Sequence, residues 1–129
     1  MEQADATQKK LLLVEDDSFI LDIYDMKLSE AGYDVTLANN GREAVKQLEE
    51  NQFIPDLILL DIVMPYMDGF DVLKVLKEND TWKDVPVIML TNLSQKDDIE
   101  RAVEMGANDY LIKSHFTPSE VLTKIQKYI

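Results

Sequence analysis

The 129-residue chain carries 25 acidic side chains against 13 Lys and Arg, and it has no cysteine. Its net charge of -12 disfavours contact with nucleic acid and anionic membranes, which proteins bind mainly through lysine and arginine. The absence of cysteine excludes disulfides, thiolate metal sites and thiol nucleophiles. The length fits one domain, which we place at residues 10–129, after a flexible polar tail at residues 1–9. No signal peptide or membrane span is recognisable, so we expect a cytoplasmic protein.

Five short apolar runs, most of them rich in Val, Ile or Leu, recur along the chain. Each run is too short for a core helix. Continuous apolar runs of this length are typical of strands that are buried on both faces of a parallel sheet. The predicted strands are residues 11–14, 35–38, 57–60, 87–90 and 110–112.

Segments with helical spacing separate the predicted strands. In the first, apolar residues recur at helical intervals, and Gly32 follows as a helix stop. Asn40 with Glu43, and Ser94 with Asp97, each place a capping residue three positions before an acid, as at a helix start. The first apolar stripe consists of Ile20, Ile23, Tyr24, Leu28 and Ala31.

The last two helices are delimited by similar signals. A stripe of Ile99, Ala102 and Val103 ends before Gly106. The sequence Thr-Pro-Ser-Glu at residues 117–120 supplies a cap, a proline at the first helical position and a capping-box acid. The apolar face of this last helix is expected at Val121, Leu122, Ile125, Tyr128 and Ile129.

Strands and helices therefore alternate five times, which predicts an α/β fold with a five-stranded parallel sheet and helices on both faces. For such a (βα)5 chain we adopt the flavodoxin-like strand order 2-1-3-4-5. Ligands in these folds bind beyond the carboxyl ends of the strands, between strands 1 and 3, where the strand order reverses.

Chemically active side chains follow four of the predicted strands. An acidic run at residues 15–17 follows the first strand and Asp61 follows the third, whereas Thr91 and Lys113 follow the fourth and fifth. If the first and third strands are neighbours, their acids meet in one crevice that Thr91 and Lys113 border.

Packed carboxylates repel one another, and some stay protonated unless a cation neutralises them. Oxygen-only coordination favours a hard cation, and a few carboxylates completed by water favour Mg²⁺ or a similar divalent ion such as Mn²⁺. An aspartate can also act as a nucleophile and form an aspartyl phosphate. A metal, a hydroxyl and an ammonium would then cover the three equatorial phosphoryl oxygens.

These motifs, in this order, resemble those of the response regulator receiver domain of two-component signal transduction. The resemblance extends over residues 10–129, and its specificity lies in the ordered set and not in any single piece. The matching segments are Leu-Leu-Leu-Val-Glu15-Asp16-Asp17, Leu-Leu-Asp61-Ile-Val-Met64-Pro65 with Asp68-Gly69, Thr91, and Lys113.

The resemblance implies roles for the matched residues. Asp61 would accept a phosphoryl group from a histidine kinase or a phosphotransfer protein, and Thr91 and Lys113 would hold that group. The chain would be no enzyme beyond its own phosphorylation and dephosphorylation. The Mg²⁺ ligands would be Asp16 directly, Glu15 through water, Asp61, and the backbone carbonyl of Val63.

The resemblance also implies an output surface. Thr91 and the aromatic switch residue Tyr110, which we also expect in the core, would alter the face of the fourth helix, fifth strand and fifth helix. A downstream protein would read this face. Because the chain ends with its fifth predicted helix, we expect a stand-alone receiver, either a monomer or a weak phosphorylation-dependent dimer. We expect it to bind neither nucleic acid nor membrane.

The sequence departs from the family pattern near the predicted site. Ser114 stands where proline usually follows the lysine, one extra residue follows near His115, and Asn92 replaces a small residue. A cis peptide bond before a non-proline residue costs about 3 kcal/mol, so we expect the Lys113-Ser114 bond to be trans. The long, flexible side chain of Lys113 should still reach the site.

Three other functions compete with a phosphorylated receiver. A phosphatase of the haloacid dehalogenase type would need a second acid two residues after the nucleophile, where this chain has Val63. A flavodoxin-like flavin carrier would need a Ser, Thr and Gly-rich loop in place of the acidic run at residues 15–17. The third is a binding module that works without phosphorylation.

Overall fold

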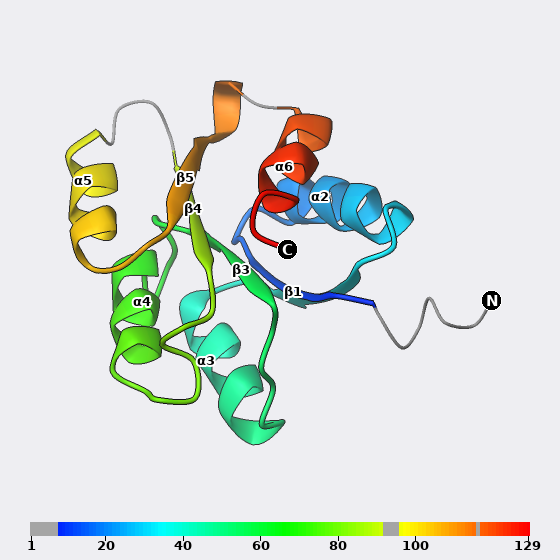
Figure 1. Cartoon of the computed structure of the whole chain (residues 1–129). Coiled ribbons are helices and arrows are strands. Elements are labelled where there is room, and N and C mark those ends of the chain that lie inside the picture. The colour runs from blue at the N-terminus through cyan, green and yellow to red at the C-terminus, as the bar shows by residue number, and fades with distance from the viewer. Residues whose placement is uncertain (1–7, 92–95, 116) are drawn as a thin grey trace.

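The computed structural model describes residues 8–91, 96–115 and 117–129. Its five strands form one parallel sheet in the order β2-β1-β3-β4-β5 (Figure 1), which confirms the predicted strand order. The strands are β1 (Lys10–Val14), β2 (Asp34–Ala38), β3 (Leu57–Asp61), β4 (Val87–Thr91) and β5 (Asp109–Ile112).

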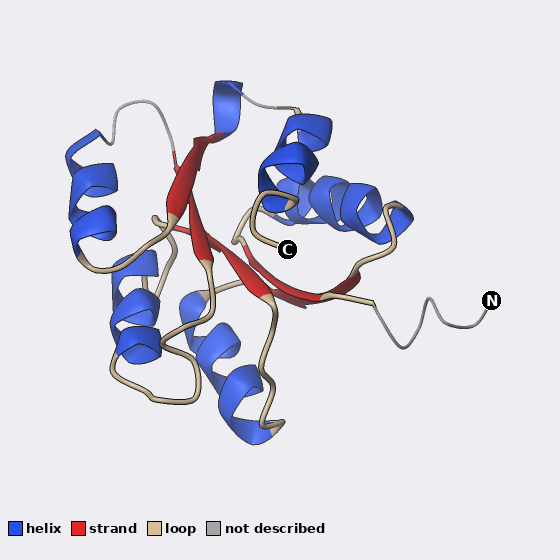
Figure 2. Cartoon of the chain, viewed as in Figure 1, coloured by secondary structure: helices blue, strands red, loops and turns tan. Residues whose placement is uncertain are grey.

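Helices cover both faces of the sheet, as predicted. The helices α2 and α6 lie on one face, and α3, α4 and α5 lie on the other (Figure 2). None of the helices described is long and apolar enough to cross a membrane. Their bounds are α2 (Ser18–Glu30), α3 (Gly41–Glu50), α4 (Gly69–Lys77), α5 (Lys96–Glu104) and α6 (Pro118–Ile125), with a short 3-10 helix, η1 (Lys113–His115), between β5 and α6.

The sheet separates two apolar cores. Leu11 and Leu13 of β1 pack beneath α2 and α6, whereas Leu12 and Val14 pack toward α3 and α4. This division follows from the strand geometry, since successive side chains point to opposite faces. The strands β1, β3 and β4 are buried almost throughout, which is why they read as continuous apolar runs.

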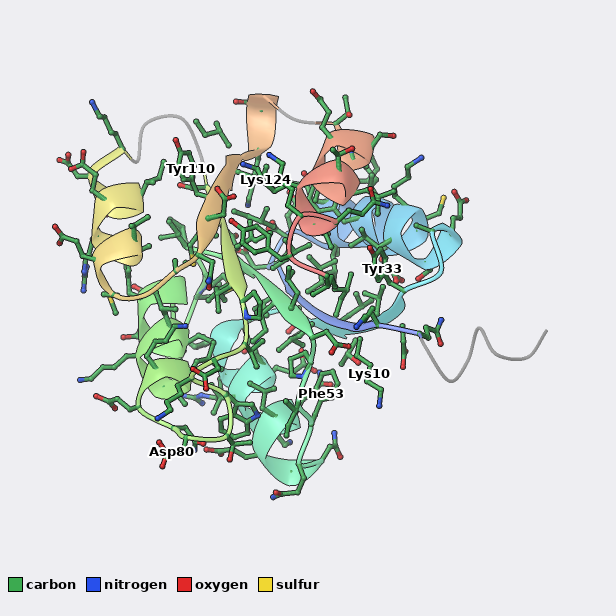
Figure 3. The ribbon with its side chains drawn as sticks, viewed as in Figure 1. Lys10, Tyr33, Phe53, Asp80, Tyr110 and Lys124 are labelled. Carbon is green, nitrogen blue, oxygen red and sulfur yellow. The ribbon has the colours of Figure 1, made fainter. Side chains whose placement is uncertain are left out.

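The two outer strands are less buried than the sequence predicted. In β2, Val35 and Leu37 are only half-buried, because this strand has a neighbour on one side alone. Tyr110 of β5 was expected in the core, but 40% of its surface is exposed. β5 is the edge strand at the opposite side of the sheet from β2, and Figure 3 places Tyr110 on the part of β5 that faces α5.

The buried faces of two helices also differ from the predicted stripes. Helix α2 buries Leu21, Tyr24 and Leu28, whereas Ile23 is exposed, because the contact line with the sheet passes through Leu21. Helix α5 buries Ala102 but leaves Val103 about half exposed.

The helix ends largely follow the sequence signals. Asn40 accepts a hydrogen bond from the Glu43 amide, and Thr117 and Glu120 form a reciprocal capping box at the start of α6. Gly32 follows α2 and Gly106 follows α5. Both have positive φ, a conformation that glycine adopts without strain. Ser94, the expected cap of α5, lies outside the described residues, as do residues 1–7 of the expected tail.

Candidate functional site

Three carboxylates meet where β1 and β3 end. These strands are parallel neighbours, with Val14 in register with Leu60, so the residues after Val14 come to lie beside Asp61. One oxygen from each of Glu15, Asp16 and Asp61 lies within 4.8 Å of the others. The predicted acidic crevice is therefore present at the predicted switch point of the sheet.

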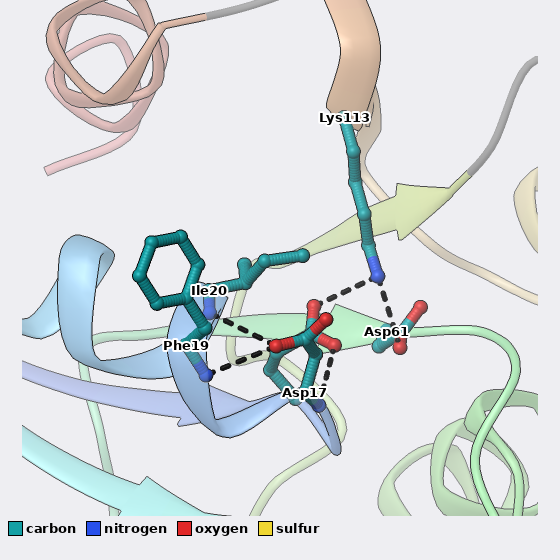
Figure 4. Close-up of polar contacts among 6 residues, drawn as sticks. Asp17, Phe19, Ile20, Asp61 and Lys113 are labelled. Atoms are coloured by element: carbon teal, nitrogen blue, oxygen red, sulfur yellow. Dashed lines mark hydrogen bonds and ion pairs between the residues drawn. The ribbon is translucent and has the colours of Figure 1, made fainter.

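Lys113 reaches this cluster from the end of β5. Its Nζ lies 2.8 Å from Oε1 of Glu15 and 3.1 Å from Oδ2 of Asp61 (Figure 4). The described residues contain no cis peptide bond, so the Lys113-Ser114 bond is trans, and η1 carries the chain from β5 toward α6. The expectation that Lys113 reaches the site without a following proline is met.

Burial makes the charges of the cluster interact strongly. Glu15 has no exposed surface and Asp61 has 4%. The pKa of Asp61 is raised to about 7. Desolvation is the largest cause and the negative charge of Glu15 is the second, whereas Lys113 lowers the pKa. Burial alone would lower the pKa of Lys113, but its contacts with Glu15 and Asp61 raise it overall.

The donor set fits a hard divalent cation. Every ligand in the cluster is a carboxylate oxygen, and three carboxylates face one ammonium. Oε2 of Glu15 accepts a hydrogen bond from the Asp17 amide, and the buried Oε1 contacts the ammonium of Lys113 at 2.8 Å. When all three carboxyls are ionised, Lys113 balances one of the three negative charges, and a divalent ion would neutralise the other two.

The two aspartates after Glu15 have different surroundings. Asp17 caps α2, because its Oδ1 accepts hydrogen bonds from the amides of Phe19 and Ile20 at 3.0 and 3.2 Å (Figure 4). Asp16 is exposed and contributes its oxygen to the carboxylate cluster. The structure thus assigns capping to Asp17 and leaves Asp16 facing the site.

Gly69 fixes the backbone that carries Asp61. Gly69 is the first residue of α4, and its amide donates a hydrogen bond of 2.8 Å to the carbonyl of Ile62. A Cβ at Gly69 would collide with the carbonyl oxygen of Asp61 and lie 2.8 Å from Cα of Ile62. The sequence indicated a turn at this glycine, but its close approach to Asp61 could be seen only in the structure.

The remaining predicted residues lie around the cluster at different depths. Thr91 is fully buried at the end of β4 and pairs with Ile112 of β5. The side chain of Val63 is 55% exposed in the loop after β3, and Tyr110 stands on the outer strand. Asn92 lies outside the described residues.

Sequence reasoning missed one neighbour of the site. Tyr24 is buried on α2, and desolvation raises its pKa. The charge of Lys113 lowers this pKa and that of Glu15 raises it, both by smaller amounts. Its helical spacing indicated only a core residue, since nothing in the sequence relates α2 to the end of β5.

Comparisons with known proteins agree with this geometry. Residues 11–126 match the response regulator receiver domain. The chain belongs to this family. A receiver domain is not a conventional enzyme, and membership sets aside the haloacid dehalogenase and flavodoxin alternatives.

Relatives of known structure have the same fold. Chemotaxis protein CheY4 of Vibrio cholerae is 31% identical with a TM-score of 0.85, over 95% of this chain and 100% of that one. The receiver domain of sensor histidine kinase PA1611 from Pseudomonas aeruginosa PAO1 is also 31% identical, with a TM-score of 0.84 over 95% and 98%. That receiver has a magnesium ion coordinated in its active-site cleft.

A curated relative is longer than this chain. The alkaline phosphatase synthesis transcriptional regulatory protein PhoP of Bacillus subtilis is 37% identical over 118 residues, which are 92% of this chain but 47% of PhoP. The chain thus spans about half the length of the curated relatives it matches.

Proposed function

We propose that this receiver accepts a phosphoryl group on Asp61 from a histidine kinase or a phosphotransfer protein. The observation that carries the proposal is the position of Asp61, buried between two further carboxylates and the ammonium of Lys113. In the transfer, an Oδ of Asp61 forms a bond to phosphorus while the bond between phosphorus and the donor nitrogen breaks. The chain's own contribution is positioning and charge stabilisation.

A divalent cation, Mg²⁺ or Mn²⁺, would be held by the three carboxylates. Asp16 and Asp61 would bind it directly, Glu15 through water, and the Val63 carbonyl would complete the protein ligands. The bound ion supplies positive charge against the phosphoryl oxygens. The magnesium in the related PA1611 receiver supports this assignment.

Two further side chains would hold the phosphoryl group. Lys113 already stands 3.1 Å from Asp61, so its ammonium would shift from the carboxylate to a phosphoryl oxygen. The hydroxyl of Thr91, at the end of the neighbouring strand, would donate to a second oxygen. Movement of Thr91 would change the end of β4, and with it the position of Tyr110.

Output would occur at the face formed by α5, β5 and α6. We propose that a downstream protein reads this face and that the domain works in the cytoplasm as a monomer or a weak phosphorylation-dependent dimer. Its net charge of -12 disfavours direct contact of this domain with nucleic acid or anionic lipid.

Incubation with acetyl phosphate and Mg²⁺ tests the proposal. Intact mass spectrometry should detect one added phosphoryl group on the wild type and none on Asp61→Asn, which keeps the shape but removes the nucleophile. Asp68→Asn is the control, because Asp68 caps α4 outside the carboxylate cluster. Equal labelling of Asp61→Asn and the wild type would refute the assignment, and no labelling of the wild type would favour a binding module that works without phosphorylation.

A further inference from the structure

A groove open to solvent runs between α5 and β5. Its volume is about 460 Å³. The five lining residues of α5 recur at spacings of i, i+3, i+4, i+7 and i+8, so they share one face of the helix. The lining residues are Lys96, Ile99, Glu100, Val103, Glu104 and, from β5, Tyr110.

The floor of this groove is apolar. Val103 and Tyr110 expose 49% and 40% of their surfaces, and Ile99 is half-buried beside them. Leu111 packs into the core under α2 and α6, so the alternation of the strand turns Tyr110 toward α5. Exposed apolar side chains that gather from two elements, unlike scattered ones, mark a surface for binding.

The rim of the groove is acidic. Glu100 and Glu104 are exposed, and Lys96 is the one cation among the lining residues. Two nearby cations are engaged elsewhere. The guanidinium of Arg101 lies 4.1 Å from the centre of the Phe70 ring, and Lys124 pairs with Asp109 at 3.2 Å.

We propose that this groove binds a protein segment whose apolar side chains are flanked by lysine or arginine. The apolar floor would take the anchors, and the acidic rim, on a chain of net charge -12, would attract the flanking cations. An acidic segment would meet repulsion from the same rim. The choice of a basic partner rests on this charge complementarity.

The groove is also connected to the phosphorylation site. Its strand wall, β5, pairs with β4 through Thr91 and Ile112, and α5 follows β4 along the chain. The apolar floor and acidic rim determine which kind of segment binds at the output face. Only the role of this binding as the output of phosphorylation rests on the proposed function. Binding to the unphosphorylated chain requires neither Asp61 chemistry nor Mg²⁺.

Two synthetic peptides test the proposal. The first carries two leucines four positions apart with lysines at the flanking positions, and the second has glutamate in place of every lysine. Each is titrated against the unphosphorylated, Mg²⁺-free chain, with binding followed by amide chemical shifts. The lysine peptide should bind at least about tenfold more tightly, lose affinity as salt is raised, and shift residues that line the groove.

Charge reversal provides the sharper comparison. Glu100→Lys with Glu104→Lys should reverse the preference between the peptides, whereas Glu49→Lys with Glu50→Lys makes the same change of net charge on exposed positions of α3 and should keep it. Val103→Ser, which leaves the charge unchanged, should weaken binding of the lysine peptide. Equal binding of the two peptides to the wild type, or shifts centred away from the groove, would overturn the proposal. A failure of Asp61 phosphorylation would leave these results unchanged.

Discussion

Asp61 occupies a position where burial and neighbouring charge both oppose ionisation. Its pKa of about 7 lies well above the ordinary value near 4 because the carboxyl is desolvated and lies beside Glu15. The carboxylate that must bind a metal and attack phosphorus is therefore partly protonated at neutral pH without a metal. A bound cation would favour the ionised, nucleophilic form.

This environment predicts a pH dependence of stability. A carboxyl whose pKa is higher in the folded than in the unfolded chain stabilises the fold fully below about pH 4. That contribution is lost as the pH rises through the folded value of about 7. In metal-free protein, the wild type should thus lose stability relative to Asp61→Asn between about pH 4 and 8.

Urea unfolding of the two proteins at several pH values measures this difference. Subtracting the free energy of unfolding of Asp61→Asn removes the contributions of other groups, such as Asp109, whose pKa is lowered. A difference that stays constant across this pH range would show that Asp61 ionises normally in the folded protein.

The exposed carboxylate of Asp16 gives a second prediction at the scale of one residue. Mg²⁺ should stabilise the wild type, by about 2.7 kcal/mol at a hundredfold excess over Kd, because it binds the folded cluster and not the unfolded chain. Asp16→Ala should lose most of this gain, because it removes a direct ligand.

Thermal unfolding with and without Mg²⁺ provides the measurement. Asp22→Ala is the matched control, since it removes one exposed carboxylate from the same part of the chain without touching the cluster. If both variants retain the wild-type gain, the metal does not bind at Asp16.

At the scale of elements, the start of α4 is packed against the residue that carries the chemistry. Gly69→Ala would place a methyl group against the backbone of Asp61 and Ile62. We expect a loss of about 1–3 kcal/mol from overpacking and slower phosphorylation, because the end of β3 must shift.

Gly32→Ala separates these two effects. A Cβ at Gly32 has no atom within 4 Å, but its φ of +101 strains any other residue, so stability should fall by about 1–2 kcal/mol. Phosphorylation by acetyl phosphate should remain at the wild-type rate in this variant. Equal phosphorylation rates in the two variants would show that Gly69 does not position Asp61.

The elements that the sequence predicted best are those with uniform surroundings. The strands β1, β3 and β4 are buried on both faces, so their apolar runs are unbroken. The outer strands were harder, because the sequence does not show which strand lies at an edge, and the expectation for Tyr110 was wrong for that reason. The buried face of α2 was misplaced because both Leu21 and Ile23 are apolar, and only packing distinguishes them.

At the scale of the whole molecule, the site depends on topology. Glu15 and Asp61 are far apart in the sequence, and only the pairing of β1 with β3 brings them together. The sequence supplied the residue types and their positions after the strands, whereas the strand order was taken from the fold class. The double contact of Lys113 required the structure, because the sequence does not show the 3-10 turn that follows β5 or the direction in which the lysine side chain leaves it.

The central claim is that Asp61 is the phosphorylated residue, and locating the acyl phosphate tests it most directly. The chain is incubated with acetyl phosphate and Mg²⁺, reduced with borohydride, which converts an aspartyl phosphate to homoserine, and digested for peptide mass spectrometry. Homoserine at position 61, dependent on Mg²⁺, is the predicted result. Homoserine at Asp16 or Asp17, with unmodified aspartate at position 61, would contradict the claim.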